Sequence, residues 1–243
     1  MGLFDLLKPK QKGVQETRSA LDAADDGTAD DGVVGGLVTR ILAMGLDGVG
    51  PLDSARAVAD EALRESGGDV DKAVRKVARM HLVGGAVGGF ATGLGGFVTM
   101  PVALPVNVLE FYVQAARMVG AVAALRGYDI SDPRIRTAIA LTLVGSDADE
   151  ILNRAGLSTG AGRLTTTALR GLPPTAMLMV NKAVGFRLIK GVGTKAFARF
   201  GRGVPVAGGV VGGAIDGWMM KKIGDAALKE FPPRAAGSVA GGA

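Results

Sequence analysis

The sequence predicts an all-α protein: a glycine-rich helical bundle with a proline-broken apolar hairpin, associated with a membrane. Its 243 residues are 48% hydrophobic but only 5% aromatic, and 39 of them are glycine. This composition favours helices that pack closely over a core built from large rings. Within residues 80–124, the stretch 81–109 carries no Asp, Glu, Lys or Arg. A helix needs about 20 apolar residues to cross a bilayer, so this stretch is long enough to insert.

Glycines recur at every fourth residue in two parts of the chain. The two sets are Gly85, Gly89 and Gly93, and Gly209, Gly213 and Gly217. Glycines at this spacing line one face of a helix and let a second backbone approach closely, as in a glycine zipper. We therefore expect the two helices to cross at these faces. Pro101 and Pro105 interrupt the first apolar stretch and predict a break in its helix.

Composition divides the chain into four segments. These are a short amphipathic peptide at 1–12, an acidic linker at 13–32, a helical domain at 33–231 and a tail rich in Pro, Gly and Ala at 232–243. The linker has too few apolar residues to order itself. The peptide carries the apolar side chains of Leu3, Phe4, Leu6 and Leu7. It fits either a membrane interface or the groove of a protein partner, and we interpret it as a targeting peptide.

Helix start signals recur inside the domain. Asp53 is expected to cap a helix over 54–65, and Asp69 a helix over 70–80. Asp132 followed by Pro133 predicts a further helix start, because proline suits the first helical position. Apolar helical patterns also cover 33–44, 134–144 and 174–190.

A polar stripe follows Pro105 on an otherwise apolar helix pattern. Its members are Asn107, Glu110, Gln114 and Arg117, spaced three, four and three residues apart. Residues at these spacings are helix neighbours and can bond in series. If the stripe is enclosed, the carboxylate of Glu110 needs a cation or a proton. If it is exposed, the stripe is the solvated face of an amphipathic helix.

The C-terminal half is strongly basic. Residues 81–243 hold seventeen basic and nine acidic residues, and no acid occurs between Ile151 and Ile215. Such a block attracts anionic lipid head groups or nucleic acid, but few aromatic residues accompany it and no nucleic-acid motif appears. We expect an anionic-lipid face formed by Lys182, Arg187, Lys190, Lys195, Arg199 and Arg202. The alternative is an ordinary solvated basic surface.

Catalytic and cofactor motifs are weak. The chain has no cysteine and a single histidine, which excludes thiolate chemistry and paired-histidine metal sites. Residues 191–196 match G-x-G-x-x-A, but a basic helix pattern precedes them where a dinucleotide fold needs a strand. The acids at 147–150 fit the first turn of a helix better than a metal site. We expect no enzymatic activity, no cofactor and no metal.

Four segments carry a family resemblance. They are GFATGLGGFVTMPVALPVNVLEFYVQAARMVGAVAALRGYD, DPRIRTAIALTLVG, VNKAVGFRLIKGVG and VPVAGGVVGGAIDGWMMKKIGDAA. In this order they resemble the EcsC family of bacterial proteins over residues 33–231. The resemblance implies an all-helical, membrane-associated protein, in a family whose founder is named for an operon encoding an ABC transporter. It implies no established enzymatic activity and no catalytic residues.

These observations predict a non-enzymatic scaffold or adaptor on the cytoplasmic side of the cytoplasmic membrane. Its basic face would meet anionic lipid, with Trp218, Lys221 and Lys222 as an interfacial anchor. The N-terminal peptide would tether a protein partner or the membrane, and the protein could form oligomers. One alternative is a soluble helical adaptor of the same fold that binds a protein. The second is a hydrolase or lipid-handling enzyme using Glu110, which would need a second carboxylate nearby.

Overall fold

A computed structural model describes the chain in six stretches. The backbone is described for residues 31–49, 52–94, 96–145, 148–154, 173–200 and 205–234. The side chains of these residues are described except at 31–35, 85–108, 154, 174 and 189–212. Within the described stretches the chain is helical apart from turns and one isolated bridge between Val49 and Leu52. The all-α prediction is confirmed.

Eight α-helices and one π-helical turn are described. They are α2 (Asp31–Leu42), η1 (Ala43–Asp47), α3 (Ala55–Glu65), α4 (Val70–Leu94), α5 (Gly96–Leu125), α6 (Pro133–Val144), α7 (Ala148–Arg154), α9 (Pro174–Phe200) and α10 (Pro205–Glu230).

Short polar side chains fix where three of these helices begin. The carboxylate of Asp69 accepts a hydrogen bond from the amide of Lys72, and Asp132 caps α6 in the same way, which confirms both predicted starts. The prediction of Asp53 as a cap was wrong. Ser54 is the N-cap of α3, and its Oγ accepts from the amide of Ala57 at 3.1 Å. Both residues are acceptable caps, so the sequence alone could not decide between neighbours.

The apolar hairpin is present, but prolines do not break it. α4 runs to Leu94, and α5 starts at Gly96 and runs back along the molecule. α5 then continues through Pro101 and Pro105 without interruption. A proline removes one backbone hydrogen bond and can bend a helix. Both prolines lie in the first third of a 30-residue helix, where the following turns hold the helical path.

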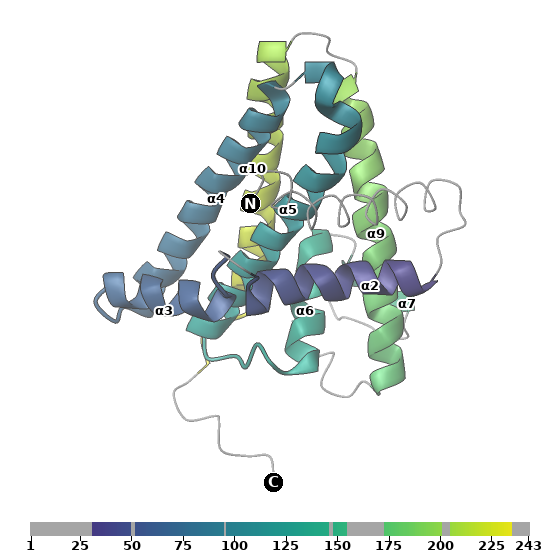
Figure 1. Cartoon of the computed structure of the whole chain (residues 1–243). Coiled ribbons are helices and arrows are strands. Elements are labelled where there is room, and N and C mark those ends of the chain that lie inside the picture. The colour runs from purple at the N-terminus through teal and green to yellow at the C-terminus, as the bar shows by residue number, and fades with distance from the viewer. Residues whose placement is uncertain are drawn as a thin grey trace, which may run out of the picture.

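Two pairs of consecutive long helices, here called hairpins, form the body of the molecule; α4 packs on α5, whereas α9 packs mainly on α2 and α6. Figure 1 shows α4 rising and α5 descending on one side, with α9 rising and α10 descending beside them. α10 packs along α4 and also contacts α5 and α6, while α2 crosses α9 and α5. The end of α10 is held by Arg126, which donates to the carbonyl oxygens of Leu228 and Phe231 at 3.2 and 2.9 Å.

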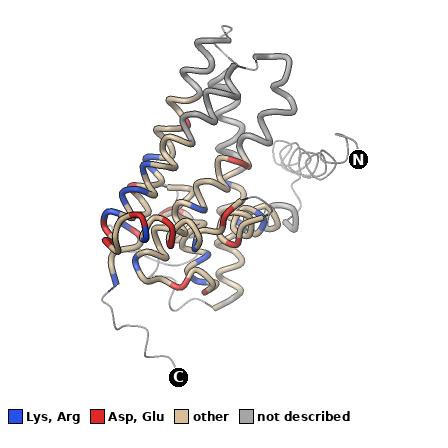
Figure 2. The backbone as a smooth tube through the Cα atoms, turned by 60° about the vertical axis from the view of Figure 1, so that its left-hand side comes forward, with Lys and Arg blue, Asp and Glu red and all other residues tan. Residues whose placement is uncertain are grey.

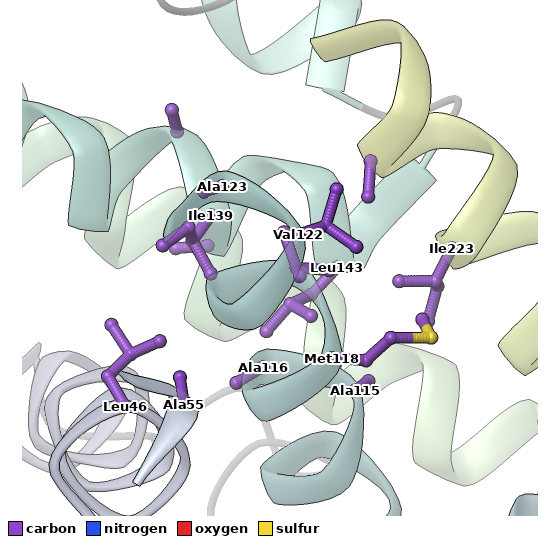
Figure 3. Packing of buried hydrophobic residues seen from close by; sticks show 14 of the residues in the cluster. Leu46, Ala55, Ala115, Ala116, Met118, Val122, Ala123, Ile139, Leu143 and Ile223 are labelled. Atoms are coloured by element: carbon purple, nitrogen blue, oxygen red, sulfur yellow. The ribbon is translucent and has the colours of Figure 1, made fainter. Parts of the chain in front are cut away.

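The second half of α5 is the centre of the core. It is buried along consecutive turns, and its side chains there are mostly small, as with Ala115, Ala116 and Ala123. Small side chains allow neighbouring helices to approach α5 from several directions, as Figure 3 shows around Met118 and Val122. The same contacts place Leu46 of η1 and Ile223 of α10 against this helix.

Among the described residues, acidic and basic side chains lie mainly at one end of the molecule. In Figure 2 the described acidic and basic residues gather around α3, the first half of α4 and the turns near α6. Ion pairs there include Lys76 with Glu65 and Arg136 with Asp47. The opposite end is formed by the reversals of the two hairpins.

Candidate functional site

The hairpin end brings two distant parts of the sequence together. Leu94 and Gly96 mark the reversal of the first hairpin, and Phe200 and Pro205 mark that of the second. All four helix ends meet at the top of the molecule in Figure 1. The first hairpin contributes a sequence without charge over residues 82–109. The second contributes Lys190, Lys195, Arg199 and Arg202 with no acid among them. The hairpin end of the molecule thus combines a hairpin whose sequence there has no charge with a hairpin whose sequence there is basic and has no acid.

The two predicted glycine helices lie side by side. They are α4 and α10, which pack along each other. Gly213 and Gly217 are buried in α10. The surroundings of Gly85, Gly89, Gly93 and Gly209 fall outside the described side chains, so direct contact between the two glycine faces stays a prediction. Gly84 has no neighbouring atom within 4 Å of the position a Cβ would take, so the face of α4 on which Gly84 lies points outward.

Large apolar side chains are exposed on the helices that lead to this end. On α10, Trp218 is 58% exposed, and the ammonium of Lys222 lies 4.3 Å from the centroid of its indole ring. Met80 and Val83 are exposed on the neighbouring helix α4. An exposed tryptophan stacked with lysine is typical of residues at a membrane–water interface.

A second exposed apolar strip lies on α9. Leu178 and Met179 are each at least 70% exposed, and Phe186 is partly exposed one to two turns further along the same helix. Lys182 lies between them in the sequence and is half-buried.

The predicted basic face is only partly visible. Arg187 of α9 is half-buried and forms an ion pair with Glu150 of α7, so its charge is partly neutralised. Lys221 likewise pairs with Asp225 on α10 at 2.6 Å. Lys190, Lys195 and Arg199 are on α9, with their side chains outside the described set, and Arg202 lies outside the described residues.

The predicted polar stripe is divided between two environments. Glu110 is exposed, Gln114 is half-buried and Arg117 is buried, while the Asn107 side chain is outside the described set. Within the described residues no hydrogen bond or ion pair joins Glu110 to Arg117. Among those residues there is also no group of His, Asp or Glu that could hold a metal ion. Whether Glu110 has any catalytic role stays untested.

Arg117 occupies an unusual position in the core. It is only 8% exposed, and its Nε and Nη2 atoms are buried with no hydrogen-bond partner among the described residues. Burial lowers the pKa of the guanidinium, and the charge of Asp53 opposes that shift. The imidazole of His81, on α4, is also buried, and its Nδ1 is 3.0 Å from the Val77 carbonyl oxygen. Burial lowers the pKa of His81, with a smaller contribution from the charge of Arg117.

A further buried carboxylate lies nearby in the same helix bundle. Asp216 of α10 is 4% exposed, and its charge acts on Tyr112 of α5. Burial, helped by this charge, raises the pKa of Tyr112 to about 12. Sequence analysis did not assign Asp216 a role in the core. Its position between Ile215 and Gly217 was the one available sign that the residue belongs to a packed helix.

Fold and site define a class: an all-helical bundle with residues of both charges at one end and, at the other, a helix pair without charge beside a segment that is basic and free of acids. No family model matches the chain, and neither a curated protein nor a solved structure matches it. In the described parts of the chain, no helix combines the length and the apolar character that crossing a membrane requires.

Proposed function

We propose that this protein is a non-enzymatic, membrane-associated helical scaffold of the EcsC type. It binds the cytoplasmic surface of a bilayer by its hairpin end, with the charged end directed into solution. The observation that carries this proposal is the convergence of an uncharged hairpin and an acid-free basic hairpin at one end of the molecule.

The chemistry of that end suits an anionic lipid surface. Each Lys or Arg near such a surface contributes on the order of 1 kcal/mol, and the second hairpin supplies four. Trp218 adds an amphipathic ring on a helix leading from this end, with Lys222 against its face. A membrane interface accommodates both groups, because the ring body is apolar while the indole N–H and the ammonium stay hydrated.

The test is co-sedimentation of the purified full chain with vesicles. Vesicles rich in phosphatidylglycerol should bind the protein, and phosphatidylcholine vesicles should bind it weakly. Arg199→Gln combined with Arg202→Gln should reduce partitioning by at least about tenfold, because two attractive charges are lost. Arg75→Gln combined with Arg134→Gln removes the same charge from exposed positions at the other end and should leave partitioning nearly unchanged. Equal losses in both double variants would contradict docking by the hairpin end.

A soluble adaptor of the same fold is the second candidate. The exposed strip of Leu178, Met179 and Phe186 on α9 favours it, because a protein partner would bury these side chains. An adaptor would show no lipid-dependent sedimentation, and Trp218→Ala would have no effect on vesicle binding. Membrane scaffolding instead requires that Trp218→Ala weaken binding to anionic vesicles.

A further inference from the structure

One exposed face of α9 has the composition of a packing surface. Leu178 and Met179 are at least 70% exposed, and Phe186 is 40% exposed. With 3.6 residues per turn, these three side chains fall within a sector of about 100° around the helix axis, so they form one strip. No described element covers this strip, although α2 and α6 pack on other parts of α9. Single exposed apolar residues are ordinary, whereas three on one helix face indicate a surface that binds a partner.

The chain itself contains a segment whose composition complements the α9 strip. Leu3, Phe4 and Leu7 recur at the spacing i, i+1 and i+4, which predicts a single apolar face on a short helix. A peptide of this length does not hold a helix alone, since isolated helices need at least about 12 residues. It therefore requires an apolar surface supplied by another element. The peptide belongs to residues 1–30, which lie outside the described part of the chain.

The position of α2 brings this peptide within reach of the strip. α2 begins at Asp31 and packs against α9, and Figure 1 shows its first turn on the α9 side of the molecule. Residues 8–30, which join the peptide to α2, can span up to about 80 Å when extended. α9 has 27 residues and is about 40 Å long. The linker therefore reaches every point on α9 with about half its extended length.

Charge favours α9 over the other helices that carry exposed apolar residues. Residues 13–32 contain six acidic residues and one basic residue, whereas α9 contains five basic residues and no acidic one. An acidic linker that leads away from α2 is attracted to the basic helix that α2 crosses. The exposed residues Met80, Val83 and Trp218 lie on α4 and α10, whereas α2 packs mainly on α9.

We propose that the N-terminal peptide binds the α9 strip of its own chain. Leu3, Phe4 and Leu7 cover the exposed apolar side chains of α9, and the acidic linker lies along the basic helix. A protein partner that uses the same strip must displace the peptide, so the peptide acts as a built-in competitor. This contact forms without a membrane, and it is separate from docking by the hairpin end.

Disulfide trapping in the full chain tests the contact, because the chain has no cysteine of its own. Leu6→Cys, which spares the predicted apolar face, is combined with Met179→Cys. The matched control combines Leu6→Cys with Asn153→Cys, since Asn153 is exposed on α7, which also packs on α9. Under mild oxidation, the Met179 pair should form an intramolecular disulfide at least about fivefold faster than the control pair. Docking raises the effective concentration of the two thiols above the value that the tether alone provides.

Variants of the strip separate docking from simple tethering. Leu178→Ser combined with Phe186→Ser changes only exposed positions, so the fold should be kept, as circular dichroism can check. The rate of the Met179 pair should then fall to that of the control pair. Equal rates in the two cysteine pairs, or a rate that the serine substitutions leave unchanged, would overturn the proposal. Disulfide-linked dimers in place of a cross-linked monomer would assign the strip to a second copy and would also overturn it.

Variants of the peptide distinguish α9 from a membrane surface. Leu3→Ser combined with Phe4→Ser should slow trapping of the Met179 pair to the control rate. The same change should leave sedimentation with phosphatidylglycerol vesicles unchanged. Loss of vesicle binding together with unchanged trapping would assign the peptide to the membrane, against the proposal.

Discussion

Glu110 and Arg117 lie seven residues apart on α5, and their surroundings differ sharply. Glu110 is exposed, whereas Arg117 is buried, with η1 packed against its backbone. Glu110→Ala should therefore change the free energy of unfolding by less than about 0.5 kcal/mol, as for most exposed substitutions. Urea denaturation of the single variant measures this. A loss of about 3 kcal/mol would instead reveal a buried network around the carboxylate.

His81 makes stability depend on pH. Its pKa in the folded protein is lowered by burial, so the unfolded chain binds a proton more readily. This contribution is fully present above the ordinary histidine pKa near 6.5 and is lost as the pH falls below it. Unfolding free energy should decrease from pH 7.5 to pH 5.5. Because the chain has one histidine, His81→Gln should flatten the slope in this window. An unchanged slope in that variant would assign the effect to other groups.

Two glycines on neighbouring elements should respond oppositely to alanine. A Cβ at Gly45 would lie 2.8 Å from both the Ala116 Cβ and the Val113 carbonyl oxygen. Because one of these atoms is backbone, Gly45→Ala should cost about 1–3 kcal/mol. Gly36 lies in α2 with nothing within 4 Å, so Gly36→Ala should be neutral or stabilise by up to about 1 kcal/mol. Thermal unfolding of both variants checks the sign of each effect.

At the scale of helices, α4 and α10 are the pair on which the glycine hypothesis depends. If their glycine faces touch, a side chain at Gly89 or Gly213 wedges the helices apart and costs about 1–3 kcal/mol. Two wedges at one contact should not add, so the Gly89→Leu, Gly213→Leu double variant should lose less than the sum. Gly84→Leu is the control and should have little effect, because that position is open. Strictly additive losses would show that Gly89 and Gly213 do not share a contact.

Sequence patterns within a few residues predicted where helices begin. They did not predict how the helices pack against one another. The caps at Asp69 and Asp132 follow from side chains that satisfy nearby amides, which requires only a few residues of sequence. The path of α5 through Pro101 and Pro105 depends on the long helix that follows and on its packing. The prediction that these prolines break the helix was therefore wrong.

The same distinction applies to the candidate sites. The uncharged and basic segments were visible in the sequence, but their meeting at one end required the topology. Arg117 was expected to pair with Glu110 along one helix face. Instead, η1 packs against its backbone and its charge acts on His81 of α4, and spacing along α5 carries no information about these elements.

At the scale of the whole molecule, the N-terminal peptide and its linker are predicted to be separable. Residues 1–30 lie outside the described part of the chain, so this prediction rests on the acidic, weakly apolar composition of the linker. Deleting them should leave Tm within about 2 °C of the full chain, since little apolar surface is lost. Location in cells or the set of bound partners should change. A cooperative loss of folding on deletion would refute the linker interpretation.

The pairing of α10 with α4 also has a consequence for biosynthesis. The two helices are separated by 110 residues of chain, and Arg126 holds the carbonyl oxygens that follow the last turns of α10. α10 is therefore translated after the other described helices. Until it arrives, one side of α4 and α5 lacks its cover, and nascent chains with exposed apolar surface are prone to aggregate. Such non-local closure slows folding, so docking of α10 is expected to be a late and slow step.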